Sequence, residues 1–265
     1  MRFFDEDPTS IVHPDEMVRS LVFPQGVEID DLDLEGLALV TFTSSDLKEW
    51  LEPGSSAKPL QAWRKRGYWI YRRDGYVVAQ SSIGAAASVM QLEEFAAFGV
   101  KRVIYLGYCG SLMDEVRVGD LVIPTEAIRE EGTSYHYLPE GRRCFPDSSL
   151  QDRIFALASA SGFTVRQGAV WTTDAPYRET KSKVYRYGRE GVLGVEMEMS
   201  ALFAVASVRN VSIGAMLLVS DELNGGVWRN GFFSNELRES RKKVIETFRP
   251  RLKTLRPEGS PGRKI

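Results

Sequence analysis

Short apolar runs typical of β-strands alternate with helix-like segments along most of this 265-residue chain. The strand-like runs are residues 37–43, 67–73, 76–82, 101–108, 120–130, 163–173 and 212–223, and the helix-like segments are 45–52, 85–98, 147–162 and 199–210. Asp74-Gly75 separates two of the strand-like runs and predicts a hairpin. Apolar strands that alternate with helices predict an α/β fold, with a mostly parallel or mixed sheet covered on both faces.

Polar residues or glycines occur at the ends of four of the predicted strands. Ligands collect at the carboxyl ends of strands in such sheets, so these four segments are expected to meet at one rim and form a site. They are residues 107–110, 172–177, 196–198 and 220–222.

The apolar segment 195–204 (VEMEMSALFA) contains two carboxylates, Glu196 and Glu198. A buried carboxylate is costly unless it is paired, so two of them at i and i+2 indicate a ligand. A carboxylate can accept hydrogen bonds from two neighbouring hydroxyls, such as those on the 2′ and 3′ carbons of a ribose. The alternative is that the two glutamates form the solvated side of an amphipathic helix.

Composition limits the remaining possibilities. The net charge of −2 gives no reason to expect nucleic acid as a partner, and no apolar run reaches the ~20 residues that span a bilayer. The N-terminus lacks a signal-peptide pattern, and Cys109 and Cys144 show no metal-ligand spacing, so we expect a cytoplasmic protein without a metal site. We expect one domain over residues 1–255 and a flexible tail over 256–265.

Several segments together resemble the nucleoside phosphorylase/uridine phosphorylase superfamily, which also contains nucleoside hydrolases. They are SSIGAAASVMQLEEFAAFGVKRVIYLGYCGSL, WTTDAPYRET, GVEMEMSALFAVA and LLVSDEL. The resemblance implies a single α/β domain whose central mixed β-sheet forms a partial barrel flanked by helices. It also implies a small-molecule nucleoside as ligand, a homo-oligomer (dimer or hexamer), and no cofactor besides phosphate as co-substrate.

The resemblance assigns roles to residues around the sugar. Glu198 resembles the glutamate that binds the ribose 2′ and 3′ hydroxyls, Met197 the methionine packed on the sugar, and Glu196 its neighbour. His13 resembles a histidine that reaches toward the ribose 5′ position of a neighbouring subunit. Asp221 matches the aspartate that gives a proton to N7 of a leaving purine, which neutralises the charge that develops on the base.

Base-binding candidates follow the strand that ends at Thr173. Thr172, Thr173, Asp174, Pro176 and Tyr177 occupy positions that the family places near the base and ribose. Because Pro176 stands where purine phosphorylases often have Phe, stacking is expected to fall to Trp171 or Tyr177. Arg178 and Glu179 could instead hydrogen-bond a pyrimidine, and Arg229 could approach the base or Asp221, so the base class stays open.

The chain departs from the family at the phosphate. The family's Gly-Asp-Pro-x-Arg-like turn corresponds to residues 43–48, where Lys48 lacks the bidentate fork of arginine. Tyr105 and Tyr108 replace an arginine and a serine or threonine that bind phosphate. The remaining candidates for a reduced phosphate site are Ser44, Ser45, Lys48, Ser82, Gly84, Tyr108 and Gly110.

Three functions therefore remain. The family norm predicts a nucleoside phosphorylase that yields free base and ribose 1-phosphate. The two tyrosines favour, as an alternative, a nucleoside hydrolase that uses water, because water needs no anion site. A non-catalytic nucleoside-binding protein is the third possibility.

Overall fold

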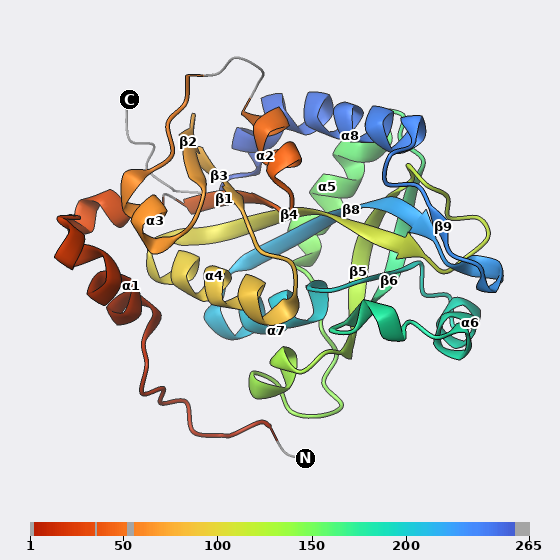
Figure 1. Cartoon of the computed structure of the whole chain (residues 1–265), viewed down its shortest axis with the longest axis horizontal. Helices are drawn as coiled ribbons and strands as arrows, with labels where there is room; N and C mark the ends of the chain where they lie inside the picture. The colour runs from red at the N-terminus through yellow and green to blue at the C-terminus, as the bar shows by residue number, and fades with distance from the viewer. Residues whose placement is uncertain (1–2, 35, 52–55, 258–265) are drawn as a thin grey trace.

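A computed structural model describes residues 3–34, 36–51 and 56–257 (Figure 1). Among these residues one nine-stranded sheet runs through the molecule in the order β2-β3-β1-β4-β7-β6-β5-β8-β9. An additional pairing of β4 with β8 closes β4, β7, β6, β5 and β8 into a five-stranded mixed barrel. The α/β fold with a barrel-forming mixed sheet, expected from the sequence, is thereby confirmed.

The strands are β1 (Gly36–Thr41), β2 (Ile70–Arg73), β3 (Tyr76–Gln80), β4 (Val100–Ser111), β5 (Leu121–Glu130), β6 (Val165–Thr173), β7 (Gly194–Glu196), β8 (Ser212–Glu222) and β9 (Arg229–Asn230). The α-helices are α1 (Pro14–Val22), α2 (Ser44–Trp50), α3 (Gln61–Arg66), α4 (Ala85–Ala97), α5 (Ser148–Ala160), α6 (Lys181–Arg189), α7 (Met199–Arg209) and α8 (Asn235–Phe248).

Helices cover the sheet on both faces, as Figure 1 shows. Helices α4 and α7 pack side by side on one face, where Phe95 and Phe203 join a large apolar core. Helices α2, α5 and α8 bury Trp50, Ile154 and Phe248 in a second core on the other face. The strands between these layers are buried on both faces, and this explains their nearly continuous apolar runs.

Most predicted elements are confirmed. The hairpin forms at Asp74-Gly75, where Arg73 pairs with Tyr76. Helix α5 begins at Asp147, whose side chain accepts a hydrogen bond from the Leu150 amide, as is usual for a helix cap. Helices α1, α3 and α6 were not predicted from the sequence, because they are short and rich in charged residues.

The strand that was predicted to end near residues 107–110 is longer than expected, because β4 continues through them to Ser111. Its glycines allow close packing against the strand. A Cβ at Gly107 would meet Phe42 and Leu217 at 3.1–3.2 Å, and one at Gly110 would meet a Leu223 methyl at 2.4 Å. A side chain at either position would force these neighbours to move, so close packing explains both glycines.

No helix in the described part of the chain is long and apolar enough to cross a membrane. The last α-helix of the described chain is α8, which is rich in charged residues and is followed by a 3-10 helix at Arg249–Leu255. Residues 258–265 of the predicted tail lie outside the described residues.

Candidate active site

The four polar strand ends predicted from the sequence converge around Gly110 of β4. Gly110 pairs with Val195 of β7 on one side and with Asp221 of β8 on the other. On the next strand Thr172 of β6 pairs with Glu196. The barrel closure thus brings together segments that are more than 100 residues apart in the chain.

Glu196 is held by the start of α7. Its Oε2 accepts hydrogen bonds from the amides of Glu198 (2.6 Å) and Met199 (2.7 Å), and its Oε1 accepts one from the Thr172 hydroxyl. Amides at a helix N-terminus lack partners within the helix, and a carboxylate there also interacts favourably with the helix dipole. Both oxygens of Glu196 therefore serve the protein itself.

A second buried hydrogen-bonded chain supports this arrangement. The Ser200 amide donates to the Thr172 hydroxyl (2.9 Å), and the Ser200 hydroxyl donates to buried Glu131 (2.9 Å). Such a satisfied network fixes the backbone of residues 196–200 and, with it, the direction of the Glu198 side chain.

Glu198 is 6% exposed and differs from Glu196 in its partners. Its Oε1 accepts a hydrogen bond from the Gly84 amide (2.7 Å), at the N-terminus of the 13-residue helix α4. Gly84 has φ +105°, which favours glycine and lets its N–H point at the carboxylate. Among the described residues no side chain donates a hydrogen bond to Glu198, so this carboxylate retains acceptor capacity for a ligand.

Burial raises the pKa of Glu198 to about 7, against hydrogen bonds from the Gly84 and Met197 backbone that lower it. Burial and the charge of Glu198 raise the pKa of Glu196 to about 8. The two carboxyls titrate as a pair near neutral pH.

This pair makes the free energy of unfolding depend on pH. Between about pH 5 and 8 the folded protein binds more protons than the unfolded one, so stability falls as pH rises. Glu196→Gln removes one of the two titrating groups and keeps an acceptor for the helix amides. We expect its loss of stability from pH 5 to pH 8 to be smaller than that of the wild type by about 1–3 kcal/mol.

Urea unfolding of both proteins at the two pH values measures this difference. Glu190→Gln, an exposed position at the end of α6, is the matched control and should behave as wild type. An equal decline in wild type and Glu196→Gln would contradict the assignment of the titration to this pair.

Asp221 lies half-buried near the end of β8, with a donor on each oxygen. The Ser220 hydroxyl donates to Oδ1 (2.7 Å), and the indole N–H of Trp228 donates to Oδ2 (2.8 Å). A Cβ at Gly110 would come within 3.0 Å of Oδ2, so the glycine leaves room for this carboxylate. Glu179 lies nearby, and burial together with the Asp221 charge raises the pKa of Glu179 to about 7.

Arg229 is directed away from Asp221 in this structure. Its guanidinium lies 3.4 Å from Glu222, which also forms an ion pair with Arg117 (3.3 Å). Neighbouring residues on β8 point to opposite faces, so the partner of Glu222 is on the other side of the strand from Asp221.

The predicted base-binding residues have very different environments. Trp171 is completely buried and packs against Tyr187 with ring centroids 4.7 Å apart, so it presents no surface to a base in this structure. Tyr177 is fully exposed, and Arg178 is exposed beside it. Thr173 is buried, and its hydroxyl accepts from the Ala175 amide (3.3 Å).

Asp174 and Met197 lie closer to Glu198. Asp174 is exposed, and its Oδ2 accepts a hydrogen bond from the Gly132 amide (2.8 Å). Its charge is among the causes that raise the pKa of Glu198. Met197 is half-buried between Glu196 and Glu198.

A buried carboxylate occupies the segment that corresponds to the family's phosphate turn. Asp46 is completely buried and accepts hydrogen bonds from the hydroxyls of Tyr108 (2.7 Å) and Thr43 (2.5 Å). Arg241 lies 3.7 Å from Asp46 and 2.6 Å from Glu49. Burial raises the pKa of Asp46, and the hydrogen bonds from Thr43 and Tyr108 oppose that shift.

Ser44 and Lys48 are exposed on α2, apart from this buried cluster. Arg66 on α3 forms a two-pronged contact with the buried carboxylate of Glu94. Arg241 and Arg66 are therefore paired with carboxylates, and Lys48 is exposed.

Tyr105 and Tyr108 both belong to β4, and their side chains point to opposite faces of the sheet. Tyr105 joins the core under α4, whereas Tyr108 packs in the core under α8. The Tyr105 hydroxyl is buried without a hydrogen-bond partner among the described residues. Burial and the nearby charge of Glu198 raise the pKa of Tyr105, so its hydroxyl is a neutral donor close to the candidate ribose site.

His13 lies far along the surface from Asp221, at the start of α1. It is exposed and lines a cavity of about 320 Å³ together with Glu93 and Arg209. The structure therefore does not bring His13 together with the residues around Glu198 within one chain.

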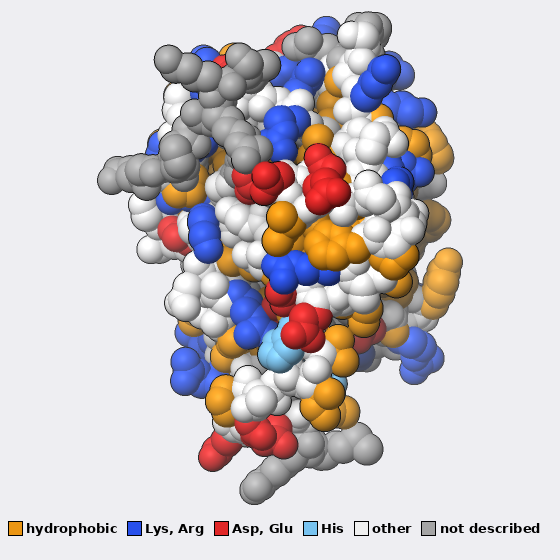
Figure 2. All heavy atoms as spheres, turned by 90° about the vertical axis from the view of Figure 1, so that its left-hand side faces the viewer, with side chains coloured by type: hydrophobic (Ala, Val, Ile, Leu, Met, Phe, Trp, Pro, Cys, Tyr) orange, Lys and Arg blue, Asp and Glu red, His pale blue; other side chains and the backbone are white. Residues whose placement is uncertain are grey.

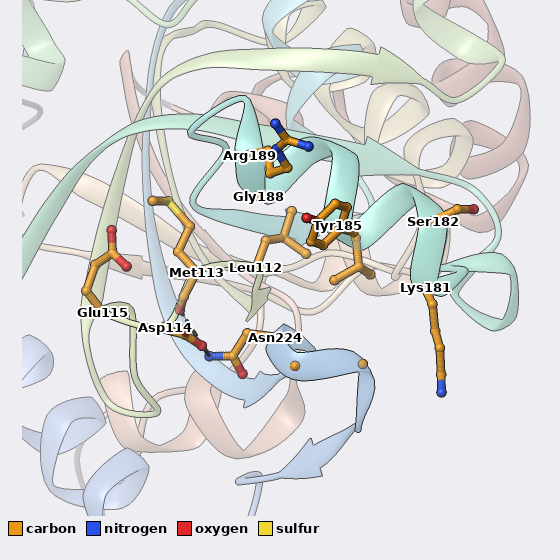
Figure 3. A pocket seen from close by; sticks show the side chains of 13 residues that line it. Leu112, Met113, Asp114, Glu115, Lys181, Ser182, Tyr185, Gly188, Arg189 and Asn224 are labelled. Atoms are coloured by element: carbon orange, nitrogen blue, oxygen red, sulfur yellow. Dashed lines mark hydrogen bonds between the residues drawn. The ribbon is translucent and has the colours of Figure 1, made fainter.

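A separate cavity of about 770 Å³ lies between α6 and the loops that follow β4 and β8 (Figure 3). Figure 3 shows Tyr185 of α6 beside Leu112, and below them Asn224 is hydrogen-bonded to Asp114. The cavity adjoins the strand ends that carry Gly110 and Asp221, but none of the predicted site residues lines it.

Sequence reasoning missed the roles of Asp46, Arg241 and Trp228. Asp46 belongs to a segment that was already compared with the phosphate turn, and a carboxylate in that segment was the available signal. Trp228 lies seven residues after Asp221 in a glycine-rich loop, and no periodic pattern in the sequence indicates that this loop folds back onto β8.

Comparison with known proteins supports one family. Residues 65–249 match the family model described as Phosphorylase superfamily. A guanosine phosphorylase of Halorubrum lacusprofundi is 28% identical over 169 residues, which are 64% of this chain and 70% of that protein. A DeoD-type purine nucleoside phosphorylase of Bacillus cereus is 33% identical over 141 residues, 52% of this chain and 60% of that protein.

Solved structures agree in fold. An AMP nucleosidase from Bacteroides thetaiotaomicron has a TM-score of 0.69 at 27% identity and covers 89% of this chain and 98% of its own. A uridine phosphorylase from Vibrio fischeri has a TM-score of 0.67 at 21% identity, with 82% and 92% covered.

Proposed function

Because the chain belongs to the phosphorylase superfamily, we propose that it cleaves the N-glycosidic bond of a nucleoside. The observation that carries this proposal is the buried carboxylate of Glu198. It accepts a hydrogen bond from the Gly84 amide and can accept further hydrogen bonds from a ligand. Two neighbouring ribose hydroxyls supply donors of the kind that such a carboxylate lacks. Met197 lies beside it and packs against the sugar.

Asp221 acts on the base in this proposal. Cleavage of the glycosidic bond leaves negative charge on the departing base, and a carboxylic acid at the purine N7 neutralises it. Asp221 and Glu198 come from strands on either side of β4, since Gly110 pairs both with Asp221 and with Val195 of β7, the strand that leads to Glu198. A purine is the favoured base because the relatives named above are guanosine and purine nucleoside phosphorylases.

The geometry favours water as the nucleophile. Phosphate is a dianion and needs cations and hydrogen-bond donors nearby. The segment 43–48, which corresponds to the family's phosphate turn, instead holds the buried Asp46 carboxylate, and this carboxylate already accepts a hydrogen bond from the Tyr108 hydroxyl. Arg241 is shared between Asp46 and Glu49, so the cluster carries no excess positive charge. The neutral Tyr105 hydroxyl, in contrast, suits a neutral water molecule.

Phosphorolysis, the norm for the family, is the second candidate, with phosphate as co-substrate and no other cofactor. The names of the phosphorylase relatives favour it. Lys48, exposed on α2, and cations from a second copy of the chain are its remaining sources of positive charge.

A panel of purine and pyrimidine nucleosides, each with and without phosphate, tests the proposed function. We expect release of free base from purine nucleosides, and we expect phosphate to change the rate less than about twofold. Absence of free base from every nucleoside would contradict the proposal and leave a nucleoside-binding protein. Saturable dependence on sub-millimolar phosphate would favour phosphorolysis.

We further propose that the chain acts as a homo-oligomer. Exposed apolar side chains gather on and before α1, and a groove of about 770 Å³ runs between α1 and α4. Figure 2 shows this side of the molecule, where hydrophobic side chains are interspersed with charged ones. His13 at the start of α1 would then be available to a neighbouring site, and light scattering after size exclusion measures the oligomer size.

A further inference from the structure

Trp228 is an exposed residue with one specific polar contact. Its indole N–H donates to Asp221 Oδ2 at 2.8 Å, while its side chain stays 60% exposed. A tryptophan placed only for packing would bury its ring, so the contact with Asp221 needs another explanation.

The backbone around Trp228 is built to return to β8. Gly225 and Gly226 have φ of +69° and +70°, which permits the turn away from the strand. The short strand β9 then pairs antiparallel with β8, with Asn230 opposite Asp221. The Gly231 amide donates to the Ser220 carbonyl (3.0 Å), so Trp228 is held at the edge next to Asp221.

We propose that Trp228 is a positioning residue that orients the Asp221 carboxyl for proton transfer to the leaving base. This inference rests on the proposed function, in which Asp221 is the acid. Trp228 is not among the site residues that the resemblance to the phosphorylase family assigns.

The direction of the indole hydrogen bond explains the role. An indole N–H can only donate, so Oδ2 has to act as acceptor. The Ser220 hydroxyl can instead donate to the Cys109 carbonyl (3.3 Å), which leaves Oδ1 to carry the transferable proton. During cleavage the Oδ1–H bond breaks, the proton forms a bond to the base nitrogen, and the electron pair stays on the carboxylate. The indole N–H and the Ser220 hydroxyl, 2.7 Å from Oδ1, then stabilise the negative charge left on Asp221.

Trp228→Phe keeps an aromatic ring and removes the donor. We expect kcat on guanosine to fall about 3–30-fold, with KM changed less than about twofold, because the lost contact is a single charge-assisted hydrogen bond at a partly exposed site. N7-methylguanosine should be cleaved within about twofold of the wild-type rate, because its base leaves without a proton on N7. Trp228→His, which retains a ring N–H, should recover part of the loss.

Trp69→Phe is the matched control, since Trp69 is 43% exposed and stacks on Tyr71 at a distant edge of the sheet. It should leave both substrates unaffected. Equal losses on guanosine and N7-methylguanosine in Trp228→Phe, or no loss on either, would overturn the inference while the wild-type activity upholds the proposed function. A wild type that cleaves neither nucleoside would overturn both.

Discussion

Asp221→Asn is expected to lower kcat on guanosine by about 10²–10⁴-fold, which is the usual contribution of general acid catalysis. The substitution preserves the size of the side chain and leaves an amide oxygen for the Trp228 indole, but it removes the transferable proton. Steady-state kinetics on guanosine and N7-methylguanosine measure the effect. Binding should change much less than kcat, because the acid acts mainly in the transition state.

The methylated nucleoside distinguishes chemistry from structure. Its base carries a positive charge before cleavage and needs no proton at N7, so Asp221→Asn should slow it less than about tenfold. If both nucleosides lose rate equally, the role of Asp221 is structural.

Glu198→Gln is expected to reduce kcat/KM on guanosine at least tenfold. The change removes charge-assisted hydrogen bonds to the ribose hydroxyls, each worth about 1.5–3 kcal/mol. The Gly84 amide can still donate to the remaining side-chain oxygen, so the fold should tolerate the substitution.

A 2′-deoxynucleoside provides the specific control for Glu198. It lacks one of the two hydroxyls, so Glu198→Gln should cost it less than it costs guanosine. An equal cost for both substrates, or unchanged kinetics on guanosine, would show that Glu198 does not hold the ribose.

The sequence predicted the fold well where local patterns and tertiary structure agree. The hairpin at Asp74-Gly75 and the capped helix at Asp147 carry their signals within a few residues. The strand end predicted at residues 107–110 was placed too early, because the glycines there are explained by side chains from residues 42, 217, 221 and 223, which no local pattern reveals.

The site was predictable in its location and less so in its chemistry. The carboxylate pair at Glu196 and Glu198 was visible as charge in an apolar run. The sequence pattern does not show which glutamate remains open to a ligand, because that depends on their backbone partners. Glu196 accepts hydrogen bonds from the amides at the start of α7, and Glu198 accepts one from Gly84.

Long-range contacts account for the residues that the sequence did not identify. Tyr108 meets Asp46 from 62 positions away, and the pairing with Arg241 comes from α8 near the other end of the chain. Stacking on Trp171 was a reasonable expectation from residue type, but the complete burial of this ring places it in the core.

The identity of the sugar product tests the central claim most directly. Guanosine is incubated with the protein in buffer that contains phosphate, and both products are measured by mass spectrometry. Cleavage at the Glu198–Asp221 site with water as nucleophile predicts guanine and free ribose in equal amounts, without ribose 1-phosphate. Intact guanosine would contradict the proposed cleavage, and ribose 1-phosphate would contradict the assignment of water as the nucleophile.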